Sequence, residues 1–499
     1  MNTRKNNAAA DAAAVDWSVV EAVQGRRFSA AMSEDVDRQL LEHLLQWGDD
    51  QEDLTFALWT PSIGNDRFSA LVHTPILPGV RDRNLHGNVA FAPEYLDRAL
   101  AQAAREGKGL AFLHSHPGPG WQDMSRDDIV AEQQRLAGCV AGMTDLPLLG
   151  LTCGIDGTWS ARFWFYAGAK RYERRWCESV RVAGRRLKCD FNDAVVRPPE
   201  FRELFKRTRT VWGDEGHKQI ARLRVGIVGL GSVGMAVAEG LARSGIERFV
   251  LVDFDEVQRH NLDRLQGTSN SADVRRLKVD VASELIERSA TARAVEVRKV
   301  PHSVVEEAGY RATLDCDVVF SCVDRPRARQ ILNHVAYAHL IPVVDGGIAV
   351  RFRGGKFRGA EWQAQTVAPG LACLECLEVF QSGDADTERN GLLDDPNYMQ
   401  GLAADHRLKS NENVYPFSTN LASMEVMQFI ALAAGLPQFD AGRVQRFYLV
   451  PGIMESNDSH ACKPSCDISN LVATGDTAFL LTGFDHAATR ARTRQSAKT

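Results

Sequence analysis

The stretch that most constrains this chain is a pattern of strand, glycine turn and helix that begins at residue 224. An apolar run typical of a buried strand leads directly into Gly229-Leu-Gly231-Ser-Val-Gly234, and a helical pattern continues through Ala242. Glycines allow close approach of the backbone to a phosphate, and a helix N-terminus offers N–H groups and a positive dipole end to an anion. The sequence therefore predicts an α/β fold with a nucleotide at this turn.

The residues after the turn favour ATP as the nucleotide. A second apolar strand ends at Asp253, whose carboxylate can hold ribose hydroxyls in either an NAD site or an ATP site. Asn261, Arg264 and Lys278 follow, an amide and two cations that suit a triphosphate. A further strand leads to Asp324, where a carboxylate can hold Mg²⁺ over the nucleotide. Taken singly, Lys278 could be a solvated surface lysine, and Asp324 could cap the following helix.

In this order, the segments GLGSVG, VDFD, HNLDR, the lysine that opens the next helix, and CVDRPRARQILN resemble the ubiquitin-activating superfamily, over about residues 200–470. That superfamily includes the ThiF-type and MoeB-type adenylyltransferases of thiamine and molybdopterin biosynthesis. The resemblance implies that Asp253 binds ribose, that Asn261, Arg264 and Lys278 contact ATP phosphates, and that Asp324 holds Mg²⁺. Arg209, in KRTRTVWGDEGHKQI, occupies the place of the arginine finger, which the other protomer of a homodimer usually supplies.

Two close cysteine pairs predict a structural zinc site in the same half. The pairs are Cys373-Leu-Glu-Cys376 and Cys462-Lys-Pro-Ser-Cys466, and four thiolates complete a tetrahedral site with no position left for water. Many activating enzymes carry a thioester-forming cysteine between such pairs, whereas this sequence has none there. The chain then either stops at the acyl-adenylate or uses a cysteine from elsewhere.

A second chemical centre lies in the first half of the chain. His114 and His116 are two residues apart at the end of an apolar strand, so both side chains point to the same face and can ligate one metal ion. Asp128, at the start of the next helical pattern, is a natural third ligand. Three protein ligands leave a fourth position open for water, as in catalytic rather than structural zinc sites. The alternative is a strand end whose histidines only make hydrogen bonds.

This segment, over about residues 35–167, resembles the JAMM metalloproteases of the MPN family, whose pattern is a distant Glu, then H-[ST]-H-P and S-x-x-D. The resemblance implies zinc ligands His114, His116 and Asp128, with Ser125 stabilising the oxyanion. Glu52, just before a predicted strand, best matches the glutamate that shuttles the proton of the zinc-bound water. One departure is that eight residues separate His116 from Ser125, where seven is the commoner spacing.

Composition sets the broad class. The chain has 499 residues, 44% of them hydrophobic, and a formal net charge of −5, which gives no reason to expect nucleic-acid binding. Neither a membrane span nor a secretory signal is recognisable, so we expect a cytoplasmic protein with no membrane partner. We expect a disordered N-terminus with a short helix at 1–32, a JAMM/MPN domain with a mixed sheet and flanking helices at 33–167, a linker at 168–199, a Rossmann-like ThiF-type domain at 200–475 and a tail at 476–499.

The resemblances together imply a fusion of two enzymes that act on the Gly-Gly tail of a ubiquitin-like protein. One half would adenylate the terminal carboxylate with ATP and Mg²⁺, and the other would cleave a bond after the same tail with catalytic Zn²⁺. The acceptor would be a conjugating enzyme in one pathway, while a sulfur-carrier pathway would make a thiocarboxylate. The rival hypotheses are an NAD-dependent oxidoreductase and a non-catalytic scaffold.

Overall fold

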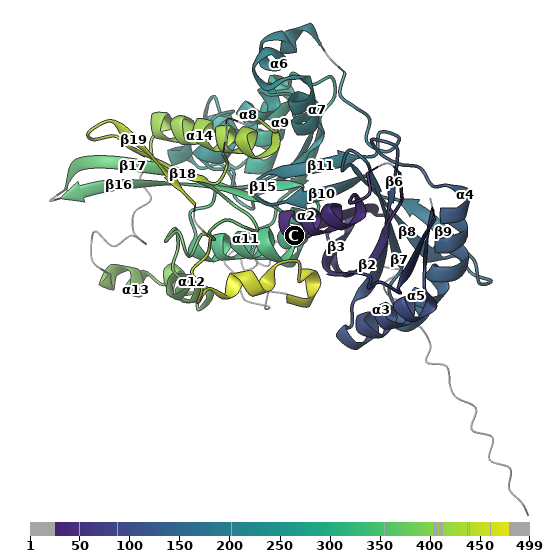
Figure 1. Cartoon of the computed structure of the whole chain (residues 1–499). Helices are drawn as coiled ribbons and strands as arrows, with labels where there is room; N and C mark the ends of the chain where they lie inside the picture. The colour runs from purple at the N-terminus through teal and green to yellow at the C-terminus, as the bar shows by residue number, and fades with distance from the viewer. Residues whose placement is uncertain are drawn as a thin grey trace, which may run out of the picture.

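A computed structural model describes residues 25–478, apart from positions 49, 87, 201, 354, 403–407, 409–412, 437, 439 and 460. Within these residues two large sheets lie side by side, one in each half of the chain (Figure 1). The α/β class predicted from the sequence is confirmed.

The first sheet has nine described strands in the order β11-β10-β1-β3-β2-β6-β7-β8-β9. It is mixed, because β1 runs parallel to β3 and β10, and β6 parallel to β7, while the other neighbours are antiparallel. Its strands are β1 (Arg27–Ser33), β2 (Leu54–Ile63), β3 (Arg67–Ile76), β6 (Gly109–His116), β7 (Leu148–Gly154), β8 (Trp159–Tyr166), β9 (Tyr172–Trp176), β10 (Ser179–Ala183) and β11 (Leu187–Phe191).

Helices flank this sheet, and a small hairpin stands beside it. The elements are α2 (Glu34–Leu44), the hairpin β4 (Arg83–His86) and β5 (Asn88–Phe91), α3 (Pro93–Glu106), α4 (Arg126–Ile129), the π-helix η1 (Val130–Leu136) and α5 (Ala137–Thr144). Ser33 caps α2 by accepting a hydrogen bond from the Val36 backbone N–H. Separate apolar clusters contain α2 and α3, so the sheet is buried between layers.

The second sheet has eight described strands in the order β14-β13-β12-β15-β16-β17-β18-β19. The five strands β14, β13, β12, β15 and β16 run parallel to one another. Strands β17, β18 and β19 extend the sheet as an antiparallel meander. The strands are β12 (Arg224–Val228), β13 (Arg248–Val252), β14 (Glu296–Val300), β15 (Val318–Ser321), β16 (Val343–Arg353), β17 (Lys356–Val367), β18 (Arg443–Tyr448) and β19 (Ile453–Asp458).

Alternate strand residues face opposite helix layers, as a doubly covered parallel sheet requires. Val225 and Ile227 pack with α8, α9 and α14, while Val250 and Val252 pack with α10 and α11. The helices are η2 (Glu203–Phe205), α6 (Lys206–Trp212), α7 (Asp214–Arg222), α8 (Ser232–Arg243), η3 (Arg259–Asn261), η4 (Ser271–Asp273), α9 (Lys278–Ser289), α10 (Glu307–Thr313), α11 (Pro326–Ala338), α12 (Ser382–Arg389), η5 (Leu392–Asp394), α13 (Pro396–Gly401), α14 (Tyr415–Ala433), η7 (Asp467–Leu471) and η8 (Gly475–Ala478).

The segments expected to be a linker and a disordered N-terminus belong in part to the first sheet. The expected linker, 168–199, contributes β9, β10 and β11, and β1 already begins at Arg27. Strand β10 is buried at every position. Its Arg181 is buried because it pairs with Asp317 of the other half, so a cation that suggested a solvated segment is part of an interior. Of the predicted N-terminal segment, residues 1–24 lie outside the described residues.

Buried charges join the two halves. The Asp317 carboxylate accepts hydrogen bonds from Arg67 Nη1 at 2.5 Å, from Arg181 Nη1 at 3.3 Å and from the Arg224 backbone N–H at 2.9 Å. Both guanidinium groups are fully buried. Nearby, His339 of the second half bonds Ser62 of the first at 2.7 Å. The halves therefore share a polar interior.

After the last cysteine the chain returns to the first sheet. Asp476, expected to open a C-terminal tail, accepts a hydrogen bond from the Ile63 backbone N–H at 2.7 Å and pairs with Arg311. The rest of that expected tail, from residue 479, lies outside the described residues. Among the described helices, none combines the length and apolar character that crossing a membrane would require.

Candidate nucleotide site and metal centres

The glycine turn between β12 and α8 forms an open backbone cradle. Gly229 adopts φ +88°, and a Cβ there would lie 2.5 Å from the Cys322 carbonyl oxygen. A Cβ on Gly234 would lie 2.0 Å from the Gly229 carbonyl oxygen, so the helix can approach the turn only without a side chain. At Gly231, which precedes α8, a Cβ would meet nothing within 4 Å. The open side of the cradle suits a phosphate group.

Asp253 lies at the end of β13 and holds this turn in place. Its Oδ2 accepts the Leu230 N–H at 2.6 Å, and its Oδ1 accepts the Asp255 N–H at 2.7 Å. Burial raises the pKa of Asp253, although Lys278 opposes the shift. Each carboxylate oxygen keeps one lone pair, which leaves the group able to accept from ribose hydroxyls.

Lys278, the first residue of α9, stands among three carboxylates. Its Nζ lies 2.8 Å from Asp255 Oδ2. Burial opposes the ammonium charge, but the carboxylates of Asp253, Asp255 and Asp324 outweigh it and raise the pKa of Lys278. The lysine and the two predicted aspartates therefore share one electrostatic neighbourhood. Sequence reasoning missed Asp255, although the second Asp of VDFD was its signal.

The other predicted ATP contacts are less closely joined to this group. Asn261 Oδ1 accepts the Gln258 N–H at 2.9 Å within η3, and Arg264 Nη1 donates to Asp263 at 2.8 Å. Arg209 lies on α6, at the outer end of this half in Figure 1, where its Nε donates to Asp214 at 2.5 Å. The roles of these three residues stay predictions.

In the first half, His114, His116 and Asp128 converge at the end of β6. The two Nε2 atoms are 3.2 Å apart, His114 Nε2 lies 3.2 Å from Asp128 Oδ1, and His116 Nε2 lies 3.3 Å from Asp128 Oδ2. Ligands bound at about 2.0–2.1 Å in a tetrahedral zinc site are about 3.3–3.4 Å apart. One donor atom from each of the three residues lies within 4.8 Å of the others, so the three residues can hold one zinc ion.

Glu52 and Ser125 lie beside this triad. The β2–β6 register pairs Leu54 with His114, and the Ser115 N–H donates to the Asp53 carbonyl at 3.0 Å, which brings Glu52 toward His116. Burial raises the pKa of Glu52, against the attraction of both histidines. Ser125 caps α4: its Oγ accepts the Asp128 N–H at 3.1 Å, and its own N–H donates to Asp128 Oδ2 at 2.7 Å. This capping box orients the third ligand.

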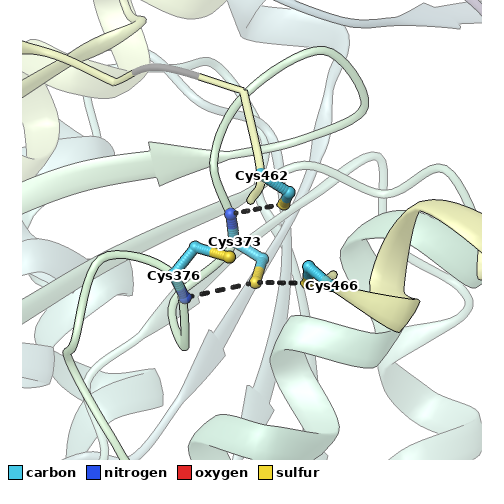
Figure 2. Close-up of side chains that lie close together, drawn as sticks. All are labelled: Cys373, Cys376, Cys462 and Cys466. Atoms are coloured by element: carbon cyan, nitrogen blue, oxygen red, sulfur yellow. Dashed lines mark hydrogen bonds between the residues drawn. The ribbon is translucent and has the colours of Figure 1, made fainter. Parts of the chain in front are cut away.

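The four cysteines predicted as zinc ligands also converge (Figure 2). Cys373 Sγ and Cys466 Sγ are 3.8 Å apart, and Cys462 Sγ accepts the Cys373 N–H at 3.2 Å. Thiolates bound to zinc at about 2.3 Å in a tetrahedron are about 3.8 Å apart. The donor set therefore fits a closed, four-sulfur zinc site.

Several curated proteins are similar to part of the chain. The chain is 30% identical over 164 residues to molybdopterin-synthase adenylyltransferase of Escherichia coli, covering 33% of this chain and 61% of that protein. It is 32% identical over 176 residues to SAMP-activating enzyme E1 of Haloferax volcanii, covering 33% and 57%. It is 26% identical over 209 residues to ubiquitin-like modifier-activating enzyme 5 of Drosophila mojavensis, covering 40% and 50%.

The chain thus spans between half and about three fifths of the length of these curated relatives. A family model described as ThiF family matches residues 205–466, which is more than half of the chain and includes the glycine turn, Lys278 and all four cysteines. The chain belongs to the ThiF family.

Proposed function

We propose that the second half adenylates the C-terminus of a ubiquitin-like or sulfur-carrier protein that ends in Gly-Gly. The observation that carries this proposal is the position of Lys278 among Asp253, Asp255 and Asp324, next to the glycine cradle. A nicotinamide oxidoreductase would give neither Lys278 nor Asp324 a role. The names of the relatives, which are adenylyltransferases and activating enzymes, point the same way.

In this reaction the terminal carboxylate attacks the α-phosphate of ATP, pyrophosphate leaves from that phosphorus, and an acyl-adenylate is formed. The backbone N–H groups at the cradle and the start of α8 hold phosphate oxygens, and Asp253 accepts from the ribose. Lys278, with Asn261 and Arg264, offsets the negative charge of the triphosphate. Asp324 would hold Mg²⁺, which supplies further charge neutralisation at the phosphates.

Exchange of labelled pyrophosphate into ATP tests this half, with a candidate ubiquitin-like protein ending in free Gly-Gly as substrate. We expect Asp324→Ala and Lys278→Met to lower the exchange rate by at least about a hundredfold, because each removes a charge that faces the phosphates. Asp280→Ala is the matched control, since Asp280 also lies on α9 but pairs with Lys299 on the surface. Exchange that survives in both site variants would refute the assignment.

We propose that the first half is a JAMM-type zinc peptidase or isopeptidase that acts on the same tail. The observation that carries this proposal is the set of three donor-atom distances, 3.2, 3.2 and 3.3 Å, between His114, His116 and Asp128. A bound zinc would supply Lewis acidity to a water molecule there. Glu52 would accept a proton and return it to the leaving amine, and Ser125, which donates its backbone N–H to Asp128, would keep Asp128 oriented.

Cleavage and metal content test the first half together. The substrate is the same ubiquitin-like protein extended beyond Gly-Gly, and its cleavage is followed by mass spectrometry. We expect Glu52→Gln to keep the zinc of the first half and lose cleavage, and His116→Ala to lose both that zinc and cleavage. Glu42→Gln, on the exposed side of α2, is the control. Full cleavage by His116→Ala would refute the peptidase, and loss of cleavage by Glu42→Gln would exclude a specific role for Glu52.

The remaining parts of the proposal concern the structural zinc, the homodimer and the molecule that receives the activated C-terminus. The four cysteines would hold a structural zinc, and a homodimer would bring Arg209 of one protomer to the nucleotide of the other. Two fates of the adenylate fit equally: transfer through a conjugating enzyme, or conversion to a thiocarboxylate. A non-catalytic scaffold is the outcome if neither half shows activity with several candidate partners.

A further inference from the structure

Beneath the His114/His116/Asp128 centre lies a buried ion pair that no step of the proposed reaction uses. Glu132 and Arg162 are both fully buried. Arg162 Nε donates to Glu132 Oε2 at 3.0 Å, Arg162 Nη2 donates to Oε1, and Trp164 Nε1 donates to Oε2 at 2.7 Å. The pair therefore satisfies both carboxylate oxygens.

Glu132 is linked to the proposed metal ligand Asp128 through the helix that carries both residues. Glu132 follows Asp128 by four residues on the same helical run, and its turn is the π-helix η1. π-Helical turns are rare and frequently lie at functional sites. Since Arg162 and Trp164 stand on β8, the bonds of Glu132 fix the helix of Asp128 against the sheet.

Arg162 reaches the second proposed ligand, His114, through the hydroxyl group of Thr152. Arg162 Nη1 donates to Thr152 Oγ1 at 2.5 Å, and Thr152 Oγ1 lies 3.5 Å from His114 Nε2. Thr152 is fully buried on β7 and is the register partner of His114 on β6. Thr152 Oγ1 accepts from Arg162, which fixes the hydroxyl group beside the His114 ring. A metal would occupy the lone pair of His114 Nε2, so Thr152 supports that ring by packing and its O–H proton stays available to an oxygen acceptor.

A glycine in the sheet leaves space for the Glu132–Arg162 pair. A Cβ on Gly150 would lie 2.4 Å from Glu132 Oε2 and 2.7 Å from Arg162 Nε, so only glycine leaves room for the pair. Stability alone does not account for such a pair, because apolar residues of similar volume usually stabilise a core as well or better. A role at the neighbouring centre does account for it.

We propose that Glu132, Arg162 and Thr152 form a positioning chain that holds Asp128 and His114 in metal-binding geometry and ends in the Thr152 hydroxyl group, which packs beside His114. This inference rests on the proposed zinc site. Residues that orient metal ligands from behind typically change metal affinity by about 10–100-fold when they are replaced. Glu132, Arg162 and Thr152 are positioning residues, since they would act through Asp128 and His114 and would not themselves bind the metal.

The test measures metal binding on the full chain and needs no protein substrate. Zinc affinity is measured by competition with a chromogenic chelator, and Co²⁺ binding by its visible absorption spectrum. We expect Glu132→Gln and Thr152→Val to weaken zinc binding at the first-half centre by about 10–100-fold and to alter the Co²⁺ spectrum. Trp159→Phe is the matched control, because it removes a buried bond to Asp37 in the same half and should leave affinity unchanged.

A second variant separates positioning from folding. Glu132→Met with Arg162→Leu fills the space with apolar groups and should remain folded, although Trp164 Nε1 loses its acceptor, yet keep the weakened zinc binding. Wild-type affinity and an unchanged Co²⁺ spectrum in Glu132→Gln or, if that variant does not fold, in the double variant would overturn the inference. If the wild type and His116→Ala bind equal amounts of zinc, the proposed metal centre fails and takes the inference with it.

Discussion

The substitution Asp317→Asn tests whether the two halves share one buried junction. The Asp317 carboxylate serves two fully buried guanidinium groups, those of Arg67 and Arg181, and one backbone N–H group. The asparagine variant keeps the shape but leaves two cations facing an uncharged amide. Breaking a buried pair from one side costs about 3–5 kcal/mol, because the remaining charge stays desolvated.

Amide hydrogen exchange measures this loss of stability separately for each strand. Since every 1.4 kcal/mol corresponds to a factor of ten, the amides of β3 and β15 should exchange about a hundredfold to a few thousandfold faster in the variant. Both strands should respond together, because Arg67 opens β3 and Asp317 precedes β15. Mass spectrometry of peptides from each strand gives the rates.

The control is an ion pair that joins the same two halves at the surface. Glu296 pairs with Arg27 at 3.1 Å, with side chains 54% and 36% exposed, so Glu296→Gln should cost less than about 1 kcal/mol. The reasoning is refuted if Asp317→Asn changes exchange by less than tenfold, or if only one of the two strands responds.

Three further predictions concern single sites. Gly234→Ala places a methyl group 2.0 Å from the Gly229 carbonyl, so calorimetric titration should show ATP binding weakened at least about tenfold. Cys466→Ser should remove one zinc per chain by metal analysis, and equal zinc in variant and wild type would exclude the four-cysteine site. Burial lowers the pKa of His73 to about 4, below its unfolded value of about 6.5, so stability is lost as pH falls between these values. In urea unfolding, His73→Gln should reduce the pH dependence of the free energy of unfolding by up to about 1.4 kcal/mol per pH unit in this range. An unchanged dependence on pH would contradict the prediction.

The sequence predicted what local patterns encode. The glycine turn, the end of β13 at Asp253 and the start of α9 at Lys278 follow from strand and helix periodicity with glycine between them. The spacing of the histidines and cysteines predicted which side chains meet, because a two-residue step on a strand fixes their common face.

What the sequence did not predict depends on partners far along the chain. Strands β10 and β11 contain arginine and lysine, which usually mark a solvated segment, and Arg181 is buried only because Asp317 lies 136 residues later. Glu132 likewise resembles a charge on the exposed side of a helix until Arg162 of β8 is placed against it. Local composition gives no signal of either pairing.

The shared interior constrains how a substrate could use both halves. The Asp317 cluster and the return of the chain to Ile63 through Asp476 hold the halves at two separate points. Separating the halves would break the hydrogen bonds of both attachments at once, so we expect an open arrangement to be rarely populated. Under the proposed function, a ubiquitin-like tail cannot be carried from one centre to the other by rotation of a domain. The tail itself has to move, either by release and rebinding or by reaching the centre of a partner chain. A point substitution that abolishes one activity and leaves the other intact should therefore lie within one of the two sites.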